Sequence, residues 1–106
     1  MLETDHFGNC QVKVTDFGFA TFFRTDTKTT SFGVGTPEYS APEIYDKTNG
    51  HNEKVDIWAV GVLTYLLLAR LHPFKKDGIV DKVAIRKREP DYSPLSNYSD
   101  EARAFV

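Results

Sequence analysis

The residues with the clearest capacity for chemistry form two short strings on either side of a polar loop. They are Asp16, Phe17 and Gly18 before the loop, and Ala41, Pro42 and Glu43 after it. A carboxylate can bind a hard cation through its oxygens. Hydroxyl groups crowd the loop and could each carry a phosphate; they belong to Thr25, Thr27, Thr29, Thr30 and Ser31. Alone, an Asp-Phe-Gly string is more often a plain turn, so its meaning depends on its surroundings.

The surroundings of both strings resemble the activation segment of protein kinases. In that family an Asp-Phe-Gly and an Ala-Pro-Glu string bracket the segment, and the phosphosite lies between them. Residues 35–43 and 55–62 match later stretches of the family in the right order, followed by a Pro-Phe pair at Pro73 and Phe74. The chain is therefore identified as a member of the eukaryotic-type serine/threonine protein kinases. Residues 89–105 look like the calcium/calmodulin-type or a related subgroup.

The resemblance implies a nucleotide site at the first string. Asp16 matches the residue that binds the magnesium ion of ATP, since magnesium relies on oxygen ligands and few protein carboxylates. Phe17 and Gly18 match a regulatory packing switch and a flexible turn. Thr15 either borders the adenine pocket or is an ordinary polar residue of a strand. The implied cofactors are ATP and Mg²⁺.

The same resemblance implies a site for a protein substrate with a Ser or Thr acceptor. Thr36 matches the threonine that stands beside the catalytic residues, and Pro37, Glu38 and Tyr39 would shape the pocket for the residue after the acceptor. Regulation would act through phosphorylation of Thr30 or Ser31. The alternative for these two hydroxyls is an ordinary solvated, mobile loop.

Four further residues have structural roles in the family. Glu43 pairs there with an arginine from a later helix, which this chain does not reach, so we expect Glu43 to be exposed or protonated. Asp56 resembles the aspartate that binds the backbone of the catalytic loop. Trp58 and Gly61 lie in the same matched run, and Gly61 within a helix predicts the close approach of another element.

Periodicity predicts the elements that must position these residues. Residues 10–15 alternate as in a strand, and Pro42 suits the start of a short helix. A long helix is expected over residues 53–70, capped by Asn52; it is apolar almost all round, as in the middle of a larger protein. Arg70 stands where relatives often have a helix-ending glycine, so that end could differ. Residues 79–85 have roughly helical spacing, and Ser99 should cap a last helix.

The expected fold is mainly α with a short β segment, a partial protein-kinase-like C-lobe that lacks the N-lobe and the catalytic loop. Within one partial kinase domain, residues 1–106, we expect a strand region at 1–15, the activation segment at 16–43 and a helical portion at 44–106, truncated at its end.

Charge, the length of the apolar run and the cysteine count limit which partners, location and metal site are expected. The net charge of −2 gives no electrostatic footprint for nucleic acid, and the apolar run of residues 57–69 is shorter than the roughly 18 residues of a membrane span. Neither partner is expected. Cys10 is the only cysteine, which suits a reducing, cytoplasmic location. Together with His6, His51 and His72 it shows no spacing typical of a zinc site.

The predicted function is that of a fragment of an ATP-dependent serine/threonine protein kinase, inactive as an isolated chain. The sequence contains no glycine-rich loop, no ATP-binding lysine and no catalytic-loop aspartate, and kinases require each of these parts. The alternative is a non-catalytic kinase remnant that binds a protein partner through its uncovered central helix.

Overall fold

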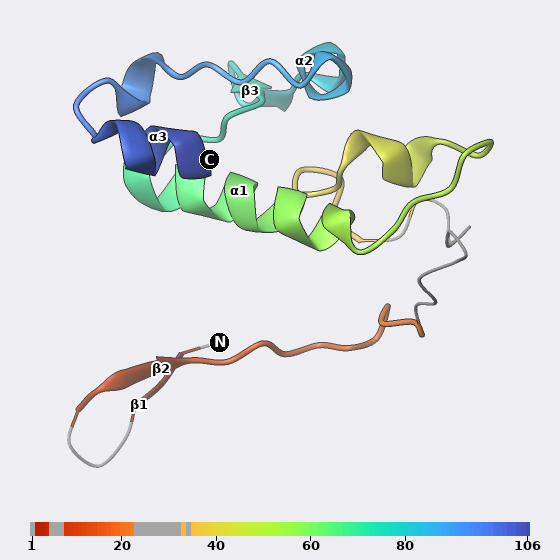
Figure 1. Ribbon diagram of the computed structural model, residues 1–106, viewed down its shortest axis with the longest axis horizontal. Coiled ribbons are helices and arrows are strands. Elements are labelled where there is room, and N and C mark those ends of the chain that lie inside the picture. The colour runs from red at the N-terminus through yellow and green to blue at the C-terminus, as the bar shows by residue number, and fades with distance from the viewer. Residues whose placement is uncertain (1, 5–7, 23–32, 34) are drawn as a thin grey trace.

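The structure is a computed structural model that describes residues 2–4, 8–22, 33 and 35–106. The helices lie in residues 35–106, called the helical body below, and the N-terminal strands lie outside it (Figure 1). In chain order the elements are β1 (Leu2–Thr4), β2 (Cys10–Val12), the 3₁₀ helix η1 (Pro42–Tyr45), α1 (Lys54–Ala69), β3 (Lys75–Lys76), β4 (Ile79–Val80), α2 (Lys82–Lys87), the 3₁₀ helix η2 (Ser93–Leu95) and α3 (Asp100–Phe105). The expected mainly α class with a short β segment is confirmed.

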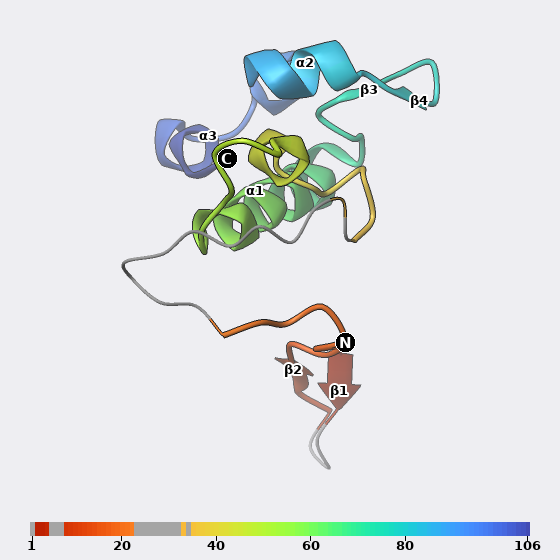
Figure 2. The ribbon, with the colours of Figure 1, turned by 90° about the vertical axis from the view of Figure 1, so that its right-hand side faces the viewer.

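Strands β1 and β2 form an antiparallel hairpin in which Leu2 pairs with Val12 and Thr4 with Cys10. The strand predicted over residues 10–15 therefore ends three residues early, because its pairing with β1 extends only to Val12, opposite Leu2. The apolar side chains of this stretch are uncovered, with Val12 83% and Val14 81% exposed. Two perpendicular views show the hairpin and the segment after it running apart from the helical body (Figures 1 and 2).

Helix α1 confirms the predicted long helix. Its N-cap is Glu53, which makes no side-chain cap bond, and not Asn52 as predicted. One position earlier, the side-chain oxygen of Asn52 accepts a hydrogen bond from the backbone N–H of Lys54 at 3.1 Å and so satisfies one free donor of the first turn. The helix ends at Arg70, which adopts the left-handed conformation with φ 55°. Its N–H donates to the carbonyl of Leu66 at 2.9 Å. The helix end is thus the same left-handed turn that glycine favours, formed here by an arginine.

One face of α1 carries the hydrophobic core. Val62 packs with Phe74 and Ile85, and the rings of Trp58 and Phe74 stack with centroids 5.4 Å apart. Nearer the other end of the helix, the hydroxyl of Tyr65 donates to the backbone carbonyl of Asp91. The opposite face is bare, because Ile57, Leu63 and Leu67 are 70%, 51% and 73% exposed. The described residues therefore cover this apolar helix on one side only.

The prediction of a helix over residues 79–85 was wrong in its first half. Asp77 and Gly78 take φ values of 52° and 80°, the left-handed pair that closes a two-residue hairpin, so β3 and β4 pair across them. Helix α2 begins only at Lys82. Its cap is Asp81, whose carboxylate accepts from the N–H groups of Val83 and Ala84 at 2.8 and 3.0 Å.

Helix α3 packs where the glycine of α1 leaves room. The oxygen of Ser99 accepts from the N–H of Ala102 at 3.3 Å, which confirms the predicted cap. A Cβ added at Gly61 would lie 3.3 Å from the backbone oxygen of Val106, so the expected close approach is confirmed as well. The short helix at Pro42 is present as η1. No helix in the described ranges combines the length and apolar character needed to cross a membrane.

Candidate functional site

Asp16 lies in a tight turn on the segment that follows β2. Its backbone is left-handed, with φ 63°, and its carboxylate accepts the N–H of Gly18 at 3.4 Å. A Cβ at Gly18 would lie 3.2 Å from that same oxygen, so glycine suits the turn sterically. Phe17 is 70% exposed, and Thr15 and Asp16 are exposed too. The turn thus presents an uncovered carboxylate to solvent.

This carboxylate has the chemistry of a magnesium ligand. Among the described residues, no three His, Cys, Asp or Glu side chains gather closely enough to hold a metal ion by themselves. Magnesium usually keeps several waters and binds one or two carboxylates together with substrate phosphates. An exposed aspartate such as Asp16 could supply one such carboxylate ligand.

Residues 36–39 form a second turn at the entrance to the helical body. The carbonyl of Thr36 accepts the N–H of Tyr39 at 3.1 Å and the hydroxyl of Ser40 at 3.0 Å. Ser40 and Ala41 are buried, at 6% and 0% exposure, whereas Thr36 and Pro37 are exposed. The turn is therefore anchored at its end and open to solvent at its start.

Contacts from the segment after α1 reach this second turn. His72 Nε2 lies 2.9 Å from the carbonyl oxygen of Glu38, and Lys75 Nζ lies 2.6 Å from its carboxylate. The rings of Tyr39 and His72 meet edge to face, with centroids 6.1 Å apart. The hydrogen bond and the positive charge of Lys75 lower the pKa of Glu38 below its ordinary value. The negative charge of the Glu38 carboxylate is thus balanced by the nearby ammonium group of Lys75.

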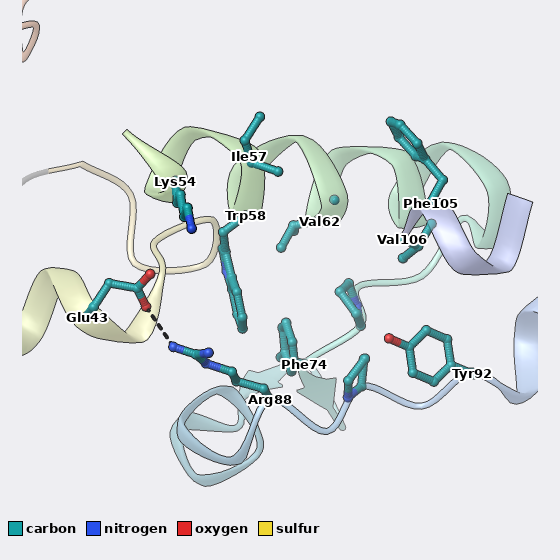
Figure 3. A pocket seen from close by; sticks show the side chains of 13 residues that line it. Glu43, Lys54, Ile57, Trp58, Val62, Phe74, Arg88, Tyr92, Phe105 and Val106 are labelled. Atoms are coloured by element: carbon teal, nitrogen blue, oxygen red, sulfur yellow. Dashed lines mark ion pairs between the residues drawn. The ribbon is translucent and has the colours of Figure 1, made fainter. Parts of the chain in front are cut away.

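Glu43 corrects an expectation of the sequence analysis. Instead of standing exposed or protonated for want of a cation, its carboxylate lies 3.5 Å from the guanidinium of Arg88, with 30% of the side chain exposed. Figure 3 shows the two side chains pointing toward each other beside Trp58. Arg88 at the end of α2 thus brings a positive charge within ion-pair distance of Glu43, although Oε2 of Glu43 accepts no hydrogen bond among the described residues.

The Glu43–Arg88 pair borders a pocket of about 400 Å³ lined partly by Trp58, Phe74 and Phe105 (Figure 3). Two buried polar atoms of residues that line this pocket have no hydrogen-bond partner among the described residues: Oε2 of Glu43 and Nε1 of Trp58. The ring of Trp58 stacks on that of Phe74, and its predicted structural role stays a prediction. Asp56, in the first turn of α1, is exposed, and its predicted role toward a catalytic loop stays a prediction.

The structure brings together only part of the predicted site. Residues 36–39 and Glu43 lie in the helical body, whereas the segment bearing Thr15, Asp16, Phe17 and Gly18 runs apart from it in both views (Figures 1 and 2). The predicted phosphosites Thr30 and Ser31 lie outside the described residues. The nucleotide and substrate halves of the predicted site are therefore two separate turns in this structure.

Comparison with known proteins identifies the family. The chain matches the protein kinase domain over residues 1–106. The chain belongs to the protein kinase domain family. It is 36% identical over 105 residues to the calcium/calmodulin-dependent protein kinase cmkB of Emericella nidulans, covering 92% of this chain and 25% of that protein. It is 47% identical over 81 residues to the cAMP-dependent protein kinase catalytic subunit 3 of Drosophila melanogaster, covering 74% and 13%.

A third relative of this kinase chain is the serine/threonine-protein kinase zyg-8 of Caenorhabditis elegans, 44% identical over 75 residues, covering 71% of the chain and 9% of that protein. The chain spans a quarter or less of the length of these three relatives. The family expected from the two strings and the residues around them is confirmed.

Sequence reasoning missed three residues that shape the site of this kinase chain: His72, Lys75 and Arg88. All three act across long separations, such as the 34 positions between Glu38 and His72. No local motif marks them, because a lysine or arginine in a polar stretch is usually only solvated. The one available signal was the matched pair Pro73 and Phe74, which placed their neighbours close to the matched core.

Proposed function

We propose that this chain is part of the larger, mainly helical lobe of a serine/threonine protein kinase, a transferase that moves the γ-phosphate of ATP to a Ser or Thr hydroxyl of a protein. Residues 16–43 would be its activation segment. The observation that carries the proposal is the exposed, left-handed Asp16 turn inside a chain matched along its whole length to the kinase domain.

Asp16 would hold the divalent ion of the nucleotide. Such an ion bridges the phosphates and offsets the charge that develops during transfer. The uncovered carboxylate leaves its oxygens accessible, while the hydrogen bond from Gly18 N–H orients one of them. Phe17 and Gly18 would regulate this turn, and Thr15 would face the adenine. Thr30 or Ser31 would be the phosphorylated residue.

Residues 36–39 would receive the protein substrate. The exposed start of this turn, at Thr36 and Pro37, leaves space for an extended peptide, while its end is anchored by buried Ser40 and Ala41. Thr36 would present its hydroxyl to the reacting groups. The carboxylate of Glu38 is already paired with Lys75, so it adds little attraction for a basic side chain of the peptide.

A chimera tests this function directly. The 106 residues would replace the aligned segment of cmkB, the relative that they cover best among the three described. We expect the chimera to phosphorylate serine or threonine in a generic protein substrate. Changing Asp16→Asn should lower kcat at least about 100-fold, the usual scale for removing a group that stabilises developing charge.

Asp77→Asn is the matched control for that chimera. Asp77 is also an exposed aspartate with positive φ, 52° against 63° for Asp16, and asparagine tolerates this conformation well. The control should keep full activity. A folded chimera whose activity is unchanged by Asp16→Asn, or which phosphorylates only tyrosine, would contradict the proposed function.

A second candidate function is a non-catalytic module that binds a protein partner through α1. The observation in its favour is the row of apolar side chains on the uncovered face of this helix, which includes Ile57, Leu63 and Leu67. Exposed apolar surface of this kind marks an interface or an aggregation site. Hydrogen exchange and size-exclusion chromatography distinguish the two: a defined complex that protects α1 supports the module, and an undefined aggregate speaks against it.

A further inference from the structure

The turn at residues 36–39 depends on a contact far away in the sequence. Within the turn, the bonds run only between near neighbours, from Tyr39 N–H to Thr36 and from Ser40 N–H to Pro37 at 3.1 and 3.3 Å. The contact that reaches the carbonyl of Glu38 from elsewhere is made by His72, 34 positions along the chain. His72 lies three residues past the end of α1 at Ala69, on the segment that leads into the packed core at Phe74.

The hydrogen bonds of His72 define which nitrogen carries the proton. The backbone N–H of Phe74 donates to Nδ1 at 3.1 Å, so Nδ1 must offer its lone pair. A neutral imidazole then has its hydrogen on Nε2, and that N–H donates to the carbonyl of Glu38 at 2.9 Å. Both ring nitrogens are therefore used, one toward the core segment and one toward the turn.

Two more contacts hold the same turn against the same segment. The rings of Tyr39 and His72 meet edge to face, with an angle of 71° between their planes. The ammonium group of Lys75 contacts the carboxylate of Glu38. The Lys75 pair is one third exposed on each side, so it is screened and weak. The half-buried His72 bond is the contact least open to competition from water.

We propose that His72 is a positioning residue for the substrate turn: with its proton on Nε2 it ties the carbonyl of Glu38 to the segment after α1, and so fixes residues 36–39 in the shape that would receive an acceptor peptide. The last clause rests on the proposed kinase function. The tie itself does not, because it is a property of this chain whether or not phosphate is transferred.

The tautomer can be read directly from the full chain labelled with ¹⁵N. A long-range ¹H–¹⁵N correlation spectrum at neutral pH, with the His72 signals assigned by their absence in the His72→Gln variant, should show Nε2 protonated and Nδ1 as an acceptor. The opposite tautomer, or signals averaged over both nitrogens, would overturn the proposal. The readout itself comes from the parent chain, so it does not depend on how a variant folds.

Hydrogen exchange tests the positioning. In His72→Ala the amides of Tyr39 and Ser40 should exchange about fivefold faster, as expected for the loss of one net hydrogen bond. His72→Gln, whose amide nitrogen can still donate, should restore exchange to within about twofold of the parent chain. His51→Gln removes a histidine that precedes α1, outside the segment 70–76 whose residues contact the turn, and should leave both amides unchanged.

Two results would contradict the positioning role. One is unchanged exchange at Tyr39 and Ser40 in His72→Ala. The other is equally faster exchange throughout α1, including Tyr65, which would mean that His72 supports the fold and not the turn in particular. Neither readout measures phosphate transfer, so failure here is separate from failure of the cmkB chimera.

Discussion

At the scale of single residues, the pairing of Glu38 with Lys75 makes a clear prediction. The ammonium group lowers the pKa of Glu38 in the folded chain, so the pair stabilises the fold above the ordinary carboxyl pKa. That contribution is lost as the pH falls through the lowered value. Lys75→Gln should therefore raise the pKa of Glu38 toward its ordinary value, as measured by carboxyl ¹³C shifts during an NMR titration.

The neighbouring lysine is the control for this titration. Lys76 lies in the same strand, β3, and successive side chains of a strand point to opposite faces. Lys76→Gln removes the same charge from the chain but should leave the titration of Glu38 in place. If both variants shift Glu38 equally, the general charge of the chain and not the close contact lowers the pKa.

Some residue roles could be read from the sequence because their causes are local or steric. Asn52 and Ser99 each accept a hydrogen bond from a free donor of a first helical turn, two or three residues away. Gly61 marks a close approach because a glycine within a helix needs such compensation. The cation beside Glu43 could not be predicted, since Arg88 is brought there only by the packing of α2. The exposed state of Asp16 likewise follows from tertiary structure.

At the scale of elements, the end of α1 carries avoidable strain. Arg70 is left-handed, with φ 55°, a conformation that costs a residue with a side chain roughly 1–2 kcal/mol. Arg70→Gly removes that strain, and the greater freedom of glycine in the unfolded chain offsets part of the gain. We expect a net stabilisation of about 1 kcal/mol, measured as a higher denaturation midpoint in urea with an unchanged slope.

Arg88→Gly is the informative comparison. Arg88 has nearly the same backbone conformation, with φ 57°, but its guanidinium is the cation beside Glu43. Loss of the ion pair should therefore offset part of the relief of strain, and this variant should gain less stability than Arg70→Gly. If Arg88→Gly stabilises the chain as much as Arg70→Gly, the pair with Glu43 contributes nothing.

The sequence predicted a helix or strand correctly where the residues of that element alone determine its structure. Helix α1 has enough consecutive apolar and helix-forming residues to be recognised alone. The hairpin of β3 and β4 was missed although Asp77 and Gly78 carry its turn signal, because the spacing of Ile79, Val83 and Ile85 fits a helix as well. Strand β2 was predicted too long because its length depends on its distant partner β1.

At the scale of the whole molecule, the described residues form a hairpin region and a helical body. The hairpin region runs apart from the helical body and does not cover it (Figure 2). Phe17, Phe19 and Phe22 on the first part are 70%, 69% and 102% exposed, and one face of α1 is uncovered as well. Relatives that are several times longer contain residues outside the matched segment that could cover both surfaces. The sequence predicted the uncovered apolar helix, but it did not predict the exposed phenylalanines.

The isolated 106-residue polypeptide should show no phosphate transfer. In the proposed function, Asp16 would orient a metal-bound nucleotide only together with other groups that hold the phosphates and orient the acceptor hydroxyl. Such groups act as a unit whose parts are strongly non-additive. The two predicted half-sites also lie on separate turns in this structure (Figure 1). A radiolabelled-ATP assay with a generic Ser/Thr substrate should give the same background for the chain and for Asp16→Ala. Turnover by the purified chain that Asp16→Ala abolishes would show that these residues form a working site on their own.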